Sequence, residues 1–361
     1  MSSALIAMSG GVDSSVAALL TVERGLDCTG SMMKLFSNED IGENRENTCC
    51  SLNDAEDARA VANKLGIPFH VFNFTDIFKE QVIRRFINSY QNGETPNPCI
   101  DCNRYLKFER LLRRASELNK EYIVTGHYAQ IEAESGSGRY ILKKGIDLSK
   151  DQSYVLYAMT QEQLKRTLLP LGGLYKSQVR EIALEHGFVN AKKSDSQDIC
   201  FVPNGNYADF ISQYTGSEYP KGRFIDADGN DLGENNGIIH YTIGQRRGLG
   251  LSAPQPLYVC SICALNNNVV VGTSDKLHTK TLIARDINLI AVDMLNAPMK
   301  VCAKIRYKHQ EQPAIVWQLD SDKIRVEFES PQRAMTKGQA VVLYDGDIVV
   351  GGGTISEVLA E

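Results

Sequence analysis

The pattern of hydrophobic and polar positions changes character a little past the middle of the chain. Before about residue 200, four short apolar runs are typical of buried strands, at 5–8, 28–36, 69–74 and 122–126. Between and after them lie stretches with the period of an amphipathic helix, at 13–24, 51–66, 75–91 and 103–119. This alternation predicts a mostly parallel sheet with helices on both faces.

Two helix starts in this half are predicted from capping residues. Thr75 can cap the helix 75–91, and Asn103 can cap the helix 103–119 after the break at Pro96 and Pro98. Cys102 would then lie just before a helix N-terminus, where the positive end of the helix dipole favours a thiolate.

The second half has the pattern of an all-β protein. Turns rich in Gly, Asn and Asp separate short runs rich in Val, Ile and Tyr, and residues 323–328 alternate strictly between apolar and polar. The predicted strands are 256–264, 268–272, 301–307, 314–319, 323–328 and 340–344. We therefore expect an α/β domain at 1–204, a small β-rich domain at 205–280 and a C-terminal β-barrel at 281–361.

Composition narrows the class of protein only slightly. With 361 residues, 43% hydrophobic and 23% charged, the chain has the profile of a soluble protein of two or three domains. No apolar run has the length of a membrane span and no basic segment precedes the first one, so we expect a cytoplasmic protein without a membrane partner. The net charge of −5 gives no hint of nucleic-acid binding, which local basic patches would have to provide.

Nine cysteines, an odd number at irregular spacing, argue against a disulfide framework and favour metal ligands or reactive thiols. Cys99 and Cys102 form a C-x-x-C pair, and Cys200 lies near the end of the α/β half. An ordinary buried thiol is an equal alternative for Cys102 and the stronger one for Cys200 when each is taken alone.

The remaining thiols carry less information. Cys260 and Cys263 form a second C-x-x-C in a predicted strand, where positions i and i+3 face opposite sides of the sheet, so we interpret them as ordinary packing. Cys49 and Cys50 are adjacent and have no predicted role.

The sharpest motif is the sequence SGGVDSS at residues 9–15, between the first predicted strand and the first helix. Two glycines let the backbone approach a phosphate, and a helix N-terminus attracts its charge. It is not a Walker loop, because Gly-Lys-Ser/Thr is absent from the sequence. The loop resembles that of the N-type ATP pyrophosphatases, which bind the pyrophosphate of ATP and transfer AMP to a substrate oxygen.

Further segments resemble one group within that superfamily, the tRNA-specific 2-thiouridylases, over essentially the full chain. They are, in order, 8–15, 97–98, 102–103, 107–108, 125–129, 150–154, 196–201, 242–246 and 306–307. The resemblance implies an N-terminal Rossmann-like ATP pyrophosphatase domain followed by two small β-rich domains. It also implies that ATP is used to replace the C2 oxygen of the wobble uridine of tRNA with sulfur.

The same resemblance implies roles for particular residues. Cys102 would be the catalytic nucleophile, and Cys200 would carry a persulfide. ATP, accompanied by Mg²⁺, would bind Ala7, Met8, Ser9, Gly10, Gly11, Val12, Asp13, Ser14, Met33 and Gly126. The tRNA would contact Asn97, Pro98, Cys99, His127, Lys150, Asp151, Gln152, Arg306, Tyr307 and Gln339. Sulfur would come from a persulfide donor such as a cysteine desulfurase or a sulfur-relay protein.

Three alternatives stay open. Cys99 stands where the best-known form of the family has aspartate, so Cys99, Cys102 and Cys200 could instead hold an iron–sulfur cluster, although we favour the persulfide relay. The chain could also be an adenylating ligase or amidotransferase of the same loop family that acts on a small metabolite. A non-catalytic RNA-binding or iron–sulfur scaffold is the third possibility.

Local basic surface would have to compensate for the acidic total. In the helix 103–119, Lys107, Arg110 and Arg114 share one face, although, taken alone, a solvated amphipathic helix is the stronger interpretation. Its apolar face is Phe108, Leu111, Ala115 and Leu118. Arg246, Arg247 and residues 304–309 add basic groups in the β half.

Taken alone, His127 could be a structural histidine at a strand end.

Overall fold

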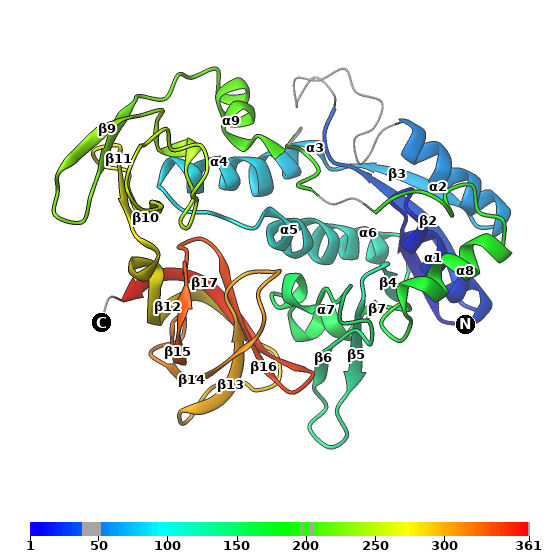
Figure 1. The fold of residues 1–361 in the computed structure, drawn as a ribbon. Coiled ribbons are helices and arrows are strands. Elements are labelled where there is room, and N and C mark those ends of the chain that lie inside the picture. Colours follow the sequence, from blue (N-terminus) through cyan, green and yellow to red (C-terminus); the bar gives the residue numbers. More distant parts are fainter. Residues whose placement is uncertain (38–51, 196–197, 203–204, 360–361) are drawn as a thin grey trace. The chain divides into compact units, whose positions relative to one another are not determined.

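The computed structural model describes residues 1–37, 52–195, 198–202 and 205–359 (Figure 1). Cys49 and Cys50 therefore lie outside the described residues, as do Ser196 and Gln197. The chain forms two compact units whose segments interleave along the sequence. Unit 1 comprises Met1–Val82, Cys99–Gly205 and Asp347–Val349, and unit 2 comprises Ile83–Pro98, Asn206–Gly346 and Val350–Glu361.

Unit 1 is built on a five-stranded sheet, as the alternation of apolar runs predicts. Its strands are β1 (Ser3–Ala7), β2 (Asp27–Lys34), β3 (Phe69–Asn73), β4 (Tyr122–Val124) and β7 (Thr167–Leu168). They lie in the order β3-β2-β1-β4-β7, and every neighbouring pair is parallel. The carboxyl ends of these strands therefore meet at one edge, where open α/β sheets bind ligands.

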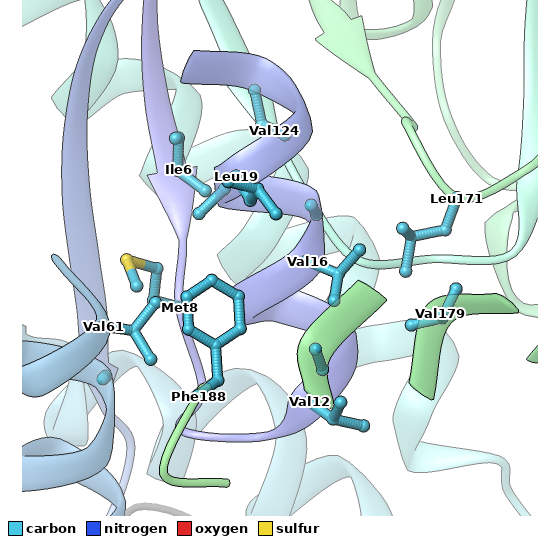
Figure 2. Packing of buried hydrophobic residues seen from close by; sticks show 14 of the residues in the cluster. Ile6, Met8, Val12, Val16, Leu19, Val61, Val124, Leu171, Val179 and Phe188 are labelled. Carbon is cyan, nitrogen blue, oxygen red and sulfur yellow. The ribbon is translucent and has the colours of Figure 1, made fainter. Parts of the chain in front are cut away.

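The core of this unit packs around helix α1 (Val12–Glu23), most of whose residues are buried. Side chains from β1, α2 (Leu52–Lys64) and α8 (Lys176–Glu185) join it, together with Phe188 (Figure 2). Burial of each large apolar side chain contributes on the order of 2 kcal/mol, so the loop between β1 and α1 is held between two well-packed elements.

The helical run over 75–91 is confirmed, but its predicted cap is wrong. The run consists of α3 (Thr75–Phe78), a π-helical turn (Lys79–Ile83) and α4 (Arg84–Gln91). Thr75 is already helical, and it is the Oδ1 atom of Asn73 that accepts the hydrogen bond from the Thr75 N–H, at 3.0 Å. The asparagine side chain thus accepts a hydrogen bond from the backbone two residues further on, as in an Asx-turn, and Thr75 is the first residue of the helix.

The next helix begins five residues earlier than predicted. It comprises α5 (Pro98–Asp101), a π-helical segment (Cys102–Arg110) and α6 (Leu111–Glu117). Pro98 occupies the first position, where its missing N–H costs nothing. Asn103 is not a cap, because it is buried in the helix and donates to the Val155 carbonyl at 3.0 Å. Cys102 therefore lies within the helical run, one turn after its start.

The rest of unit 1 consists of short elements. Strands β5 (Ala129–Ala133) and β6 (Tyr140–Lys144) form an antiparallel hairpin, and Lys143 pairs with Ile348. A 3₁₀ turn (Ser153–Leu156) and α7 (Gln161–Lys165) follow, the latter with a capping box between Thr160 and Gln163.

Unit 2 contains a helix that the hydrophobic pattern does not predict. Helix α9 (Tyr207–Thr215) is capped by Asn206 and ends at Gly216, which has a φ of 62°. Tyr207 stacks on Tyr90 of α4 with ring centroids 4.6 Å apart, which explains why Ile83–Pro98 belongs to this unit. A helix of 9 residues is too short to be stable by itself, so burial against α4 stabilises it.

Two β structures complete unit 2. The first is a four-stranded sheet in the order β10-β11-β8-β9, and the second is a barrel in the order β12-β15-β14-β13-β16-β17, closed by pairing of β12 with β17. The small sheet contains β8 (Gly222–Ile225), β9 (Asp231–Asn235), β10 (Tyr258–Cys263) and β11 (Asn268–Gly272), with 3₁₀ turns at Ile238–His240 and Ser274–Leu277. The barrel contains β12 (His278–Leu289), β13 (Met299–Lys304), β14 (Gln312–Gln318), β15 (Ile324–Arg333), β16 (Ala340–Asp345) and β17 (Ile348–Leu359). The predicted C-terminal β-barrel is thus confirmed.

Candidate functional site

The predicted phosphate loop connects β1 to α1 and is fixed at both ends. The Met8 N–H donates to the Ser31 carbonyl of β2 at 2.7 Å, which extends the strand pairing into the loop. Gly10 has a φ of +77°, and a side chain there would collide with the Asp54 carbonyl of α2. A residue other than glycine would therefore be both strained and obstructed at this position.

The start of α1 leaves its backbone N–H groups without a capping side chain among the described residues. Gly11 is the N-cap, and no side chain in the described part of the chain caps this helix. The hydroxyl of Ser14 donates to the Gly11 carbonyl at 2.9 Å and accepts from the Ser9 N–H at 3.1 Å, which folds the loop back over the helix end. The N–H groups of the first helical turn have no acceptor within the helix, so they suit a phosphate.

Gly126, just after β4, contacts the loop from the other side. A Cβ atom at Gly126 would lie 2.9 Å from the carbonyl carbon of Asp13 and 2.9 Å from the Ser14 nitrogen. The structure thus brings together the predicted ATP-binding segment 7–14 and Gly126. Met33 lies near the carboxyl end of the neighbouring β2, two residues beyond Ser31, which pairs with Ala7.

A partly buried ionic network extends from the loop. The Lys176 ammonium, at the start of α8, contacts both carboxylate oxygens of Asp13, at 2.7 and 2.8 Å, and Asp195 at 2.8 Å. The Tyr128 hydroxyl donates to Asp13 at 2.7 Å. Lys150 and Arg180 also bind Asp195, at 2.8 and 2.9 Å. Asp13, Tyr128 and Lys150 lie in segments that the family resemblance singled out, but Lys176, Arg180 and Asp195 do not, because no local pattern marks them.

This network sets the charge of its carboxylates. Burial alone would raise the pKa of Asp195, but the hydrogen bonds and charges of Lys150 and Lys176 outweigh it and lower the pKa to about 2. Burial and the neighbouring Asp13 carboxylate raise the pKa of Tyr128, so its hydroxyl remains a proton donor. Asp195 is therefore ionised at neutral pH.

The stretch that follows α8 also touches the loop. The Asn190 amide donates to the Gly10 carbonyl and to the Ser15 hydroxyl, both at 2.9 Å. Lys193 bridges Asp54 at 2.6 Å and Asp57 at 2.7 Å at the start of α2. Residues 190–195 therefore follow the phosphate loop and lead toward Cys200.

The segments that carry Cys102 and Cys200 both contact α3. The ring of Phe201, next to Cys200, packs edge-on against Phe78 of α3 with centroids 5.6 Å apart. The π-helical segment that begins with Cys102 contacts α3 as well. Cys102 and Cys200 are each partly exposed, and Cys99 is exposed. All three thiols can thus meet a solvent-borne substrate or donor.

Comparison with known proteins then identifies the chain. Successive family models match it: a tRNA methyl transferase HUP domain at residues 2–204, a tRNA methyl transferase PRC-barrel domain at 208–273 and an aminomethyltransferase beta-barrel domain at 279–355. The tRNA-specific 2-thiouridylase MnmA of Clostridioides difficile (strain 630) is 50% identical over 355 residues, which is 98% of either chain. That of Acetivibrio thermocellus is 51% identical over 97% of this chain and 98% of its own. The chain belongs to the tRNA-specific 2-thiouridylase family.

For this thiouridylase-family chain, four of the residues expected at the tRNA have side chains bound within unit 1. Lys150 pairs with Asp195, the Asp151 carboxylate accepts from the Gly145 and Ser153 N–H groups at 3.1 Å each, and Gln152 accepts from the Tyr128 N–H at 3.0 Å. Their expected tRNA contact stays a prediction.

The fourth, His127, is only 7% exposed, and its ring lies between Thr125 at 2.7 Å and the Lys107 ammonium at 3.4 Å. Burial, helped by the positive charge of Lys107, lowers its pKa well below the ordinary value, so the ring is neutral. This placement favours the structural role that the sequence also allowed, and contact with tRNA stays a prediction.

In unit 2, Gln339 links the barrel to the segment that leads into α5. Its amide donates to the carbonyls of Thr95 at 2.9 Å and Pro96 at 3.4 Å, and the Thr95 N–H donates to the Lys337 carbonyl at 2.8 Å. Asn97 and Pro98 follow directly. Elsewhere in unit 2, Arg306, which precedes Tyr307 in the sequence, donates to the Arg333 carbonyl at 2.9 Å.

The basic stripe of the helix 103–119 is weaker than its sequence indicates. Arg113 and Arg114 both pair with Glu117, at 3.4 and 2.5 Å, and Arg110 lies 3.8 Å from Glu109. Of the predicted apolar face, Phe108, Leu111 and Ala115 are buried, but Leu118 follows the end of the helix and is 37% exposed. Internal pairing leaves less positive charge for phosphates than a count of arginines implies.

Proposed function

We propose that this protein uses ATP to replace the C2 oxygen of the wobble uridine of tRNA with sulfur, through a cysteine persulfide. One observation carries the proposal: within a single compact unit, residues 190–195 contact an uncapped helix start on a phosphate-type loop, and the sequence continues five residues later to the partly exposed Cys200. The family to which the chain belongs supports tRNA as the substrate, because its relatives are named tRNA-specific 2-thiouridylases.

In the first step, the C2 oxygen of the uracil attacks the α-phosphorus of ATP, and pyrophosphate leaves. The N–H groups at the start of α1 would hold the phosphates of the leaving pyrophosphate. Mg²⁺ would enter with ATP, since it takes most of its ligands from phosphate oxygens and water. The wobble base must leave its stack to reach this site.

In the second step, the terminal sulfur of a Cys200 persulfide attacks C2, and AMP leaves with the oxygen. The Cys102 thiolate then attacks the Sγ atom of Cys200, which releases the thiolated base and forms a disulfide between Cys102 and Cys200. A thiol reductant must reduce this disulfide, and a persulfide donor such as a cysteine desulfurase or a sulfur-relay protein must reload Cys200.

Residues of each unit would contact the tRNA. Asn97, Pro98 and Cys99 would lie against the target uracil, and Arg306, Tyr307 and Gln339 would contact the tRNA from the barrel. His127, Lys150, Asp151 and Gln152 of unit 1 would contact the tRNA as well.

The iron–sulfur alternative finds no support in the arrangement of ligands. Among the residues that the structure describes, which include Cys99, Cys102 and Cys200, no group of three or more Cys, His, Asp or Glu side chains is placed to hold a metal ion. We therefore derive no step through a cluster.

Nucleoside mass spectrometry tests the proposal. Unmodified tRNA is incubated anaerobically with the protein, ATP, Mg²⁺, a persulfide donor and a thiol reductant, and we expect 2-thiouridine only when ATP is present. Absence of 2-thiouridine together with ATP turnover in the absence of tRNA would instead favour a ligase that acts on a small metabolite.

Substitution of the two cysteines tests the relay. We expect Cys102→Ser and Cys200→Ser each to lower 2-thiouridine formation by about 10³-fold or more, because each removes a bond-forming group, while ATP still binds. Cys302→Ser, at a partly exposed thiol of the barrel, is the matched control and should keep normal activity. Full activity of either of the first two variants would exclude the relay.

A further inference from the structure

Lys176 joins two parts of the proposed active site that are far apart in the sequence. Its ammonium binds Asp13, in the first turn of α1 beside the phosphate loop, and Asp195, five residues before Cys200. The two halves of the reaction, adenylation and sulfur transfer, depend on these two segments.

Burial and several partners fix the position of the Lys176 ammonium. The Lys176 side chain is only 10% exposed, and its ammonium also lies over the ring of Tyr128 at 5.7 Å. A buried ammonium is tolerated only where carboxylates compensate its charge, so Asp13 and Asp195 are both needed where they are. Three cations, from Lys176, Lys150 and Arg180, converge on the Asp195 carboxylate and fix the position of this residue.

We propose that Lys176 is a positioning residue that couples occupation of the phosphate loop to the reactivity of Cys200. The inference rests on the proposed binding of ATP at this loop. When the phosphates of ATP lie at the start of α1, their negative charge competes with Asp13 and Asp195 for the Lys176 ammonium. Asp195 then keeps two of its three cations and is held less firmly, and the Cys200 thiol, five residues further along the sequence, becomes more accessible after ATP has bound.

Alkylation of Cys200 by iodoacetamide, followed by peptide mass spectrometry under reducing conditions without tRNA, tests this coupling. In the wild type we expect ATP to raise the alkylation rate of Cys200 about fivefold or more, within the usual range for coupled sites. In Lys176→Met the rate should be high without ATP and should no longer respond to it. Lys176→Arg, which keeps the charge, should restore the response in part.

Two further variants keep the test decisive. Asp195→Asn breaks the same link at its other end and leaves Asp13 intact, so ATP should bind while the Cys200 rate no longer responds. Lys120→Met removes a lysine of equal exposure that pairs with Asp27 at 2.7 Å and with neither active-site segment, and it should behave as the wild type. An equal response to ATP in the wild type, Lys176→Met and Asp195→Asn would overturn the proposal.

The outcomes also separate this inference from the proposed function. If ATP binds and 2-thiouridine forms but the Cys200 rate is insensitive to ATP in the wild type, only the coupling is wrong. If the wild type does not bind ATP, measured by isothermal titration calorimetry, both the coupling and the proposed function fail.

Discussion

Gly10 and Gly126 are the two positions where one added methyl group would change the phosphate loop. At Gly10 both the positive φ and the Asp54 carbonyl exclude a side chain. At Gly126 only space is limiting, because the neighbouring atoms belong to the backbone of Asp13 and Ser14. Backbone atoms in a packed helix start cannot rotate away as a side chain does.

Gly126→Ala should therefore weaken ATP binding. The added methyl group would have to displace the start of α1, and overpacking of this kind costs about 1–3 kcal/mol. We expect the Kd for ATP to rise about tenfold or more, measured by isothermal titration calorimetry. Gly173→Ala is the control, since a Cβ there has no neighbour within 4 Å among the described residues. An unchanged Kd in Gly126→Ala would contradict the assigned contact.

The charge of Asp195 should be visible in the stability of the protein at acidic pH. Because its pKa in the folded state is about 2, below the ordinary value of 3.8, its ionised form stabilises the fold above about pH 4. That stabilisation is lost as the pH falls toward 2. We expect the wild type to lose on the order of 2 kcal/mol more free energy of unfolding between pH 4 and pH 2 than Asp195→Asn loses. Urea unfolding at both pH values measures this, and parallel losses would show that the network does not hold the carboxylate ionised.

At the scale of elements, the start of α5 decides the surroundings of Cys99 and Cys102. The sequence placed Cys102 before a helix, but the helix begins at Pro98, so Cys99 lies in its first turn and Cys102 in the next. The dipole effect falls off within one turn, and Cys99 is therefore closer to the positive end than Cys102. Proline at a helix start and proline as a helix breaker look alike in a sequence, which explains the error.

Gln339 should hold the segment that enters α5. Its hydrogen bonds to Thr95 and Pro96 fix backbone that is otherwise a loop. Gln339→Ala should speed amide hydrogen exchange over residues 92–97 roughly fivefold, as expected for a lost hydrogen bond worth about 1 kcal/mol. The matched control is Gln318→Ala, which removes a side-chain amide bonded to the Leu295 N–H and the Asp320 carbonyl of the same barrel. Unchanged exchange over 92–97 would mean that the segment is held by other contacts.

At the scale of the whole molecule, a net charge of −5 must be reconciled with a polyanionic substrate. Several basic groups pair with carboxylates of the chain itself, as Arg113 and Arg114 do with the one carboxylate of Glu117. Arg246 and Arg247 are instead exposed, on a turn held by the hydrogen bond from the Gly244 N–H to the Val259 carbonyl at 2.8 Å. A few exposed cations on rigid turns can bind phosphates although the total charge is negative.

Every helix among the described residues is too short or too polar to span a lipid bilayer.

The double variant Arg246→Glu, Arg247→Glu should weaken tRNA binding and its dependence on salt. Each lost phosphate contact should lower the slope of log K against log salt concentration by about one unit. Filter binding of tRNA between roughly 50 and 200 mM salt measures the slope, and ATP affinity should not change. Lys300→Glu, Lys323→Glu, which reverses two exposed charges of the barrel, is the control. Equal slopes for the two double variants would show that Arg246 and Arg247 do not contact phosphates.

The sequence by itself determined the features that depend on local pattern. The parallel sheet follows from alternating apolar runs and amphipathic stretches, the barrel from period-two strands, and the phosphate loop from glycines between a strand and a helix. Each of these rests on neighbours within a few residues, so it can be read along the chain. The family resemblance added the two cysteines, which no local pattern distinguishes from ordinary buried thiols.

Only the tertiary structure decided which distant side chains meet. Lys176 and Asp13 are 163 positions apart, and nothing near either residue indicates the other. Helix α9 forms because α4, more than a hundred residues earlier, supplies the aromatic side chains that cover it. The barrel closes only when β12 pairs with β17. In each case the partner is selected by packing and by the cost of burying an uncompensated charge, and both act through space rather than along the sequence.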